Sequence, residues 1–171
     1  FNLDSLERRG FRIYGLAPVT YPQLVWQKFW LSVATTSVFT VGLAILSAHM
    51  LNLEPIYFAM TVYSTAMINF GLGGLAVGLG TLYPTFTEDN PARIVSGMGG
   101  TLNLLVSIGY ISCVVATQTF ILQWHVLERF TSPAFFWYAL AGAVAFIFAL
   151  TLICTFVPIR LGLKNLNDME F

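Results

Sequence analysis

The side chains of this sequence that could do chemistry are few, and the most compact group of them lies in one short turn. The turn contains Glu88, Asp89, Asn90, Pro91 and Arg93 and separates two long uncharged runs that are rich in glycine. Carboxylates just ahead of a helix start complement the positive end of the helix dipole, and Asn-Pro is a favourable helix start. The turn is therefore either a well-capped helix start that faces water or a docking point for a partner protein.

The long runs themselves contain no Asp, Glu, Lys or Arg, the side chains that usually mark proton relays and ion-coupled transport in membranes. Their polar content is limited to Asn69, Asn103, Gln118 and scattered Ser and Thr. No Ser-His pair and no carboxylate pair lies at a common depth. The sequence therefore disfavours an ion-driven pump and an intramembrane hydrolase, and we expect no catalytic residue and no enzyme activity.

Histidine and cysteine offer no clear metal site. His49 and His125 fall near the outer ends of their predicted helices, where they either bind a metal, sense pH or simply face water. No third ligand accompanies them. Cys113 and Cys154 lie inside apolar runs, without metal spacing or a disulfide framework. We expect no metal and no cofactor.

The elements that carry these residues follow from composition. The chain has 171 residues, of which 57% are hydrophobic and only 9% charged. Its mean hydropathy is +0.75, whereas a soluble domain has about 25% charged residues. The sequence predicts an all-α polytopic membrane bundle whose first partner is the lipid bilayer. A net charge of zero argues against a nucleic-acid partner.

Two regions are predicted along the chain. Residues 1–22 form an amphipathic connector lying on the membrane, with Arg8, Arg9 and Arg12 available to lipid phosphate or a partner; an ordinary polar tail is the alternative. Residues 23–171 form a four-helix transmembrane domain with a short cytoplasmic tail. The predicted spans are about 24–51, 55–83, 91–125 and 132–159.

The positions of the cations predict the topology. If both termini are cytoplasmic, the outer side holds Arg129 alone. The inner side then holds Arg8, Arg9, Arg12, Lys28, Arg93, Arg160 and Lys164. This strong positive-inside bias predicts a multi-pass protein with both termini in the cytoplasm.

Small residues predict where the second and third spans pack. In Gly74-x-x-x-Gly78 the missing side chains let a neighbouring helix approach closely. Asn69 and Asn103 both lie roughly 20 Å from the central turn at the rise of an α-helix, so we expect them to hydrogen-bond across the helix pair; contact with a substrate is the alternative. The predicted helix-packing residues are Asn69, Gly74, Gly78, Gly97, Gly100 and Asn103.

Three segments carry a family resemblance. They are the opening SLERRGFRIYGLAPVTYPQLVWQKFW, the central GLGTLYPTFTEDNPARIVSGMGGTLNL and the ending RLGLKNLNDMEF. Together they resemble the C-terminal half of a type-2 ABC exporter permease, the membrane subunit of a bacterial ATP-driven transporter. Such permeases have more spans, and this chain begins with Phe1 rather than Met, so we expect a fragment or a reduced relative.

The resemblance implies a location in the bacterial cytoplasmic (inner) membrane and a separate cytoplasmic ATPase as partner in a hetero-oligomer. The sequence has no Gly-x-x-x-x-Gly-Lys-Ser/Thr phosphate loop of its own. The implied docking residues are Arg8, Arg9, Arg12, Glu88, Asp89, Asn90, Pro91 and Arg93. The predicted function is that of a permease subunit coupled through the central turn to this ATPase. The alternative is a structural or accessory subunit among other membrane subunits, as in a respiratory or photosynthetic assembly.

Overall fold

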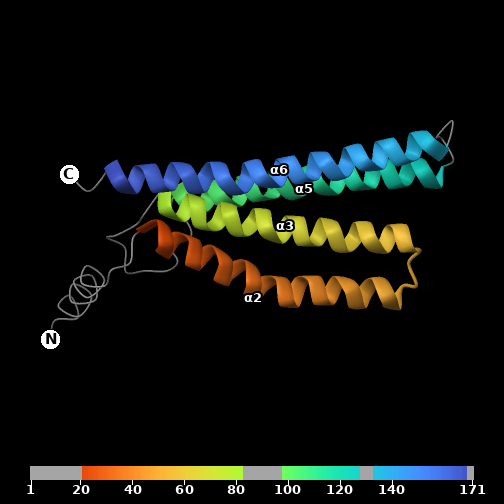
Figure 1. The fold of residues 1–171 in the computed structure, drawn as a ribbon, viewed down its shortest axis with the longest axis horizontal. Coiled ribbons are helices and arrows are strands. Elements are labelled where there is room, and N and C mark those ends of the chain that lie inside the picture. The colour runs from red at the N-terminus through yellow and green to blue at the C-terminus, as the bar shows by residue number, and fades with distance from the viewer. Residues whose placement is uncertain (1–20, 83–97, 128–132, 169–171) are drawn as a thin grey trace.

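The computed structural model describes residues 21–82, 98–127 and 133–168. These residues form four α-helices and no strand (Figure 1). All four helices are long and apolar enough to cross a membrane, so the predicted all-α membrane bundle is confirmed. Residues 1–20 of the predicted interfacial connector lie outside the described residues, and its last two residues belong to α2. The helices are α2 (Tyr21–Met50), α3 (Pro55–Leu82), α5 (Met98–Val126) and α6 (Pro133–Asp168).

The helices alternate in direction along the bundle (Figure 1). The start of α2 and the end of α6 lie at one end, which we call the terminal end. The α2–α3 turn lies at the other end, together with the last residues of α5 and the first residues of α6; we call this the turn end. Because α3 and α6 both run from the turn end to the terminal end, these two helices are parallel.

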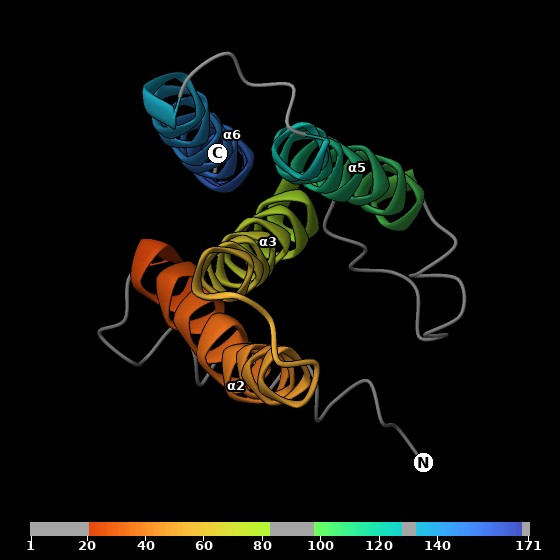
Figure 2. The ribbon, with the colours of Figure 1, turned by 90° about the vertical axis from the view of Figure 1, so that its right-hand side faces the viewer.

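Helix α3 is the centre of the bundle (Figure 2). It packs against α2, α5 and α6. The share of the membrane-spanning segment that is buried within the protein is 39% for α3, 22% for α6 and 11% for both α2 and α5. The outer face of α2 exposes large apolar side chains such as Leu31 and Phe39, which suits contact with lipid.

The α2–α3 turn has the hydrogen bonds of a Schellman motif. Asn52 has a φ of 49°, the left-handed conformation that Asn tolerates better than most residues. Its N–H donates to the His49 carbonyl at 3.1 Å, and the Leu53 N–H donates to the Ala48 carbonyl at 3.2 Å. Pro55 then opens α3 at a position where its missing N–H costs nothing. This turn fixes α2 antiparallel to α3.

Helix α6 extends beyond its predicted span, from residue 159 to Asp168. It passes through Pro158, which cannot donate to a carbonyl one turn earlier. The helix nevertheless continues, because membrane helices tolerate an internal proline where neighbouring groups pack around it. Gly78 of α3 lies directly against this proline.

Helices α3 and α6 meet in a constant register. Tyr63 contacts Val144, Gly74 contacts Thr155, Gly78 contacts Ile159 and Thr81 contacts Gly162. The partners are 81 residues apart in every pair, as expected for two parallel helices. At the terminal end the Asn165 amide donates to the Leu82 carbonyl at 2.9 Å and so satisfies a free acceptor of the last turn of α3.

Candidate functional site: an apolar groove between α3 and α6

One face of α6 alternates bulky and small side chains. Trp137, Ala141, Ala145 and Phe148 recur at helical spacing, so they lie on the same side of the helix. The two alanines between the two aromatic residues leave room beside the helix. The face is therefore hollow in its middle and bulky at its two limits.

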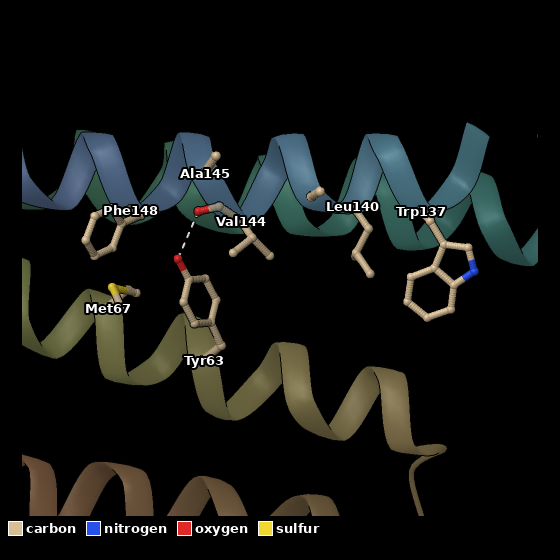
Figure 3. A pocket seen from close by; sticks show the side chains of 8 residues that line it. Tyr63, Met67, Trp137, Leu140, Val144, Ala145 and Phe148 are labelled. Carbon is tan, nitrogen blue, oxygen red and sulfur yellow. Dashed lines mark hydrogen bonds between the residues drawn. The ribbon is translucent and has the colours of Figure 1, made fainter. Parts of the chain in front are cut away.

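The hollow face of α6 and the facing side of α3 border an open groove with a volume of about 540 Å³ (Figure 3). Helix α3 contributes Tyr63 and Met67. The full lining is Tyr63, Met67, Trp137, Leu140, Ala141, Val144, Ala145 and Phe148, and we call this site the groove.

The hydroxyl of Tyr63 already has a hydrogen-bond partner within the protein. It donates a hydrogen bond to the backbone carbonyl of Val144 at 2.9 Å, across the space between α3 and α6 (Figure 3). Because this donor is already used, the inner walls present hydrocarbon, aromatic faces and the thioether of Met67. No lining residue carries a carboxylate, an amine or a guanidinium.

A buried polar cluster fixes the groove at its inner limit. Tyr110 of α5 is only 4% exposed, and its hydroxyl donates to the Met67 carbonyl at 2.8 Å. The same hydroxyl lies 2.8 Å from Oγ1 of Thr151 on α6. The Thr151 hydroxyl also donates to the Ile147 carbonyl at 2.7 Å. These contacts join α3, α5 and α6 one turn beyond Phe148.

Past this cluster α3 and α6 touch directly. A Cβ atom built on Gly74 would lie 2.5 Å from Cα of Thr155, and one built on Gly78 would lie 2.5 Å from Cβ of Pro158. Small residues permit such close contact in membranes. The two ribbons are close here and diverge toward the turn end (Figure 1), so the groove is a wedge closed at its inner limit.

The predicted docking residues lie outside the described residues. This holds for Arg8, Arg9 and Arg12 of the predicted connector and for Glu88, Asp89, Asn90, Pro91 and Arg93 of the central turn. Their role in docking stays a prediction. Gly97 also lies outside the described residues.

The predicted helix-packing residues do not form one interface. Gly74 and Gly78 are buried against α6 rather than against α5. Gly100, near the start of α5, is half-buried. The residue of α3 that packs closely on α5 is Gly71, because a Cβ there would lie 2.5 Å from the Tyr110 ring.

The predicted hydrogen bond between Asn69 and Asn103 is wrong. The Asn69 amide instead donates to the Ser37 hydroxyl of α2 at 2.5 Å. Oδ1 of Asn103 accepts from Ser107, one turn along its own helix, at 3.4 Å. Asn69 lies one turn before Gly73, which packs on Val33 of α2, so both residues are on the α2 face of α3.

No histidine or cysteine lines the groove. The His125 ring stacks on Phe136 of α6 at a centroid distance of 4.0 Å, and His49 lies in the last turn of α2. Cys113 is exposed and Cys154 half-buried, and neither is in a disulfide. Within the described residues no group of three or more His, Cys, Asp or Glu side chains is arranged to hold a metal ion.

The groove is not predicted by the sequence. Its lining consists of ordinary apolar residues, whose types alone predict no binding site. A usable signal was the pair Ala141 and Ala145, one turn apart, between Trp137 and Phe148. This alanine pair indicates a groove only once α3 is known to form the opposite wall.

One comparison with known proteins gives a match. A family model described as "Putative ATP-binding cassette" matches residues 1–171. Neither a curated protein nor a solved structure matches the chain.

This match corrects the predicted family and function. The resemblance to a type-2 exporter permease is wrong, because the matching family is described as an ATP-binding cassette and not as a permease. The predicted role as a permease subunit is overturned with it, and the alternative of a structural subunit gains no support. The resemblance rested on three short segments, and three short segments do not suffice to identify a family. Since the match covers all 171 residues, the chain belongs to this ATP-binding cassette family.

Proposed function

We propose that this chain is a membrane-embedded lipid-binding protein that holds hydrocarbon in the groove between α3 and α6. The observation that carries the proposal is the groove itself, an apolar space of about 540 Å³ whose walls belong to two membrane-spanning helices. A molecule that enters it from the side comes from the bilayer. The proposed partner is therefore membrane lipid.

The chemistry of the walls supports binding rather than reaction. Hydrocarbon and aromatic walls bind hydrocarbon well, but they do not stabilise a developing charge. Tyr63 has its hydroxyl hydrogen-bonded to the Val144 carbonyl. We propose on these grounds that the groove binds its ligand without chemical change.

The groove is distinct from a nucleotide site. The description of the family names ATP binding, but the groove offers no partner for a polyphosphate. A charged ligand needs hydrogen-bonding or oppositely charged groups when it leaves water. The proposed ligand is therefore the apolar part of a lipid.

We further propose that the protein resides in a bacterial inner membrane with both termini in the cytoplasm. The cations of the described residues support this orientation, because Lys28 of α2 and Arg160 and Lys164 of α6 all belong to the terminal end of the bundle. Positively charged residues concentrate on the cytoplasmic side of membrane proteins. The turn end then faces the opposite side.

Photo-crosslinking in proteoliposomes tests lipid binding. A phospholipid with a diazirine in the middle of one acyl chain is expected to label peptides containing Met67 and Phe148. Ala145→Phe should abolish this labelling, because the new ring occupies the groove. Ala149→Phe provides the matched control, since Ala149 is an exposed alanine one turn further along α6 and outside the lining. Equal labelling of both variants at wild-type level would contradict the proposal.

A further inference from the structure

We infer that the groove takes a single acyl chain of a glycerophospholipid from the leaflet at the turn end, with the head group beside Trp137 and the chain methyl beside Phe148. This inference rests on the proposed lipid binding and adds the ligand's class, leaflet and orientation. Three features of the groove carry it: its length, its closed inner limit and the character of its open end.

The length of the groove matches one leaflet. Trp137 and Phe148, the limits of the lining on α6, are eleven residues apart, which corresponds to about 16 Å along a helix. The hydrocarbon core of a bilayer is about 30 Å thick, so one leaflet contributes about 15 Å. A chain that follows the groove thus reaches from the interface to the middle of the membrane.

The inner limit of the groove is closed. Beyond Phe148 the next residues on this side of α6 are Thr151 and Thr155, which are 1% and 0% exposed. Thr151 lies against the Tyr110 hydroxyl, and Thr155 contacts Gly74 of α3. Because no space continues past these contacts, a ligand enters from the turn end or from the side.

The open end has the character of a membrane interface. Trp137 is in the second turn of α6 and is 61% exposed. Its indole nitrogen points away from the groove, toward the start of the helix (Figure 3). Indole rings favour the head-group level, where the ring contacts hydrocarbon and the N–H finds a polar partner. A phosphate or ester oxygen beside Trp137 supplies that partner.

The neighbouring side chains agree with this assignment. Phe136, next to Trp137, stacks on the His125 imidazole at 4.0 Å, so a polar ring lies at the same level of α5. At the start of α3, Glu54 is exposed. The turn end of the bundle therefore carries polar side chains, whereas the inner part of the groove is lined by Met67 and Phe148.

Two crosslinking lipids distinguish the orientations. One phospholipid carries a diazirine near the acyl carbonyl and the other carries it near the chain methyl; both are incorporated in proteoliposomes with the wild-type protein. The first probe should label the peptide from Trp137 to Ala141, and the second should label Met67 and Phe148. A reversed pattern, or the same pattern from both probes, overturns the inferred orientation while lipid binding stands. Loss of groove labelling with both probes overturns the proposed function itself.

Substitution of Trp137 tests the head-group contact. Trp137→Phe keeps an aromatic ring and removes the N–H, so the affinity for phospholipid should fall about two- to tenfold, as expected for one hydrogen bond. Binding of a diazirine-bearing alkane, which has no head group, should not change. Tyr138→Phe is the matched control, because Tyr138 is 79% exposed and outside the lining. Equal phospholipid affinity of Trp137→Phe and wild type overturns the inferred contact.

Discussion

Gly74 of α3 lies directly against the backbone of Thr155 on α6, so closely that a methyl group on Gly74 would come within 2.5 Å of Cα of Thr155. Thr155 is fully buried, and the contact is between one helix backbone and the other. This contact sets the narrow end of the wedge between α3 and α6. The stability of the helix pair and the shape of the groove therefore depend on the same glycine.

Gly74→Ala should lower the free energy of unfolding by about 1–3 kcal/mol, since the added methyl forces apart two backbones that cannot yield as a flexible side chain does. Gly78→Ala should have a similar effect, because its Cβ would meet Pro158. The measurement is reversible unfolding in mixed micelles with increasing SDS.

Gly80→Ala is the matched control for both glycine variants. Gly80 is exposed on the same helix, and a Cβ there meets no atom within 4 Å. Alanine is a better helix former than glycine, so this variant should be neutral or stabilised by up to about 1 kcal/mol. If Gly74→Ala were as stable as Gly80→Ala, the described packing of α3 on α6 would be incorrect.

Tyr110→Phe should lower the free energy of unfolding by about 0.6 kcal/mol, the average for interhelical hydrogen bonds in membranes, and by at most about 1.7 kcal/mol. The variant keeps the ring against Gly71 and removes the hydroxyl that bonds to the Met67 carbonyl. The same SDS titration measures the change, and Tyr138→Phe is expected to have no effect. An unchanged Tyr110→Phe variant would show that the polar cluster contributes nothing measurable.

A double-mutant cycle tests the partner of Asn69. Asn69→Ala combined with Ser37→Ala should give a coupling energy of about 0.6–1.7 kcal/mol, since the two side chains are hydrogen-bonded. Asn69→Ala combined with Asn103→Ala should be additive. Coupling in the second cycle and additivity in the first would reverse the assignment of Asn69 to the α2 interface.

Cysteine labelling tests the proposed orientation. In a Cys113→Ala, Cys154→Ala background, Glu54→Cys should react with a membrane-impermeant maleimide in intact bacterial cells. Lys164→Cys should react only in inside-out vesicles, because it belongs to the terminal end of the bundle. Labelling of both positions from the same side would contradict the alternation of the four helices.

The four membrane helices could be predicted from the sequence, but which helices pack against each other could not. Long uncharged runs identify membrane spans because every backbone polar group must be satisfied inside the bilayer. The same runs carry little information on pairing, since lipid offers no hydrophobic drive between helices. Gly74 and Gly78 were identified as contact residues, yet α6 as their neighbour appears only in the structure.

The groove was missed for a related physical reason. An apolar wall that faces a ligand and an apolar wall that faces another helix have the same composition. Ala141 and Ala145 mark a groove only because α6 packs beside α3. This packing is shown by the Tyr63 hydroxyl, which reaches across the gap to the Val144 carbonyl 81 residues later in the chain. The family resemblance rested on three short segments, and these did not identify the family.

The 81-residue separation between α3 and α6 has a consequence for biosynthesis. At translation rates of about 5–20 residues per second, roughly 4–16 s pass between the synthesis of a glycine of α3 and of its contact on α6. During that interval the central helix has α2 beside it, but the surface around Gly74 and Gly78 awaits the last helix. Enlarging these glycines should therefore leave the insertion of the first three helices intact and impair the final docking of α6.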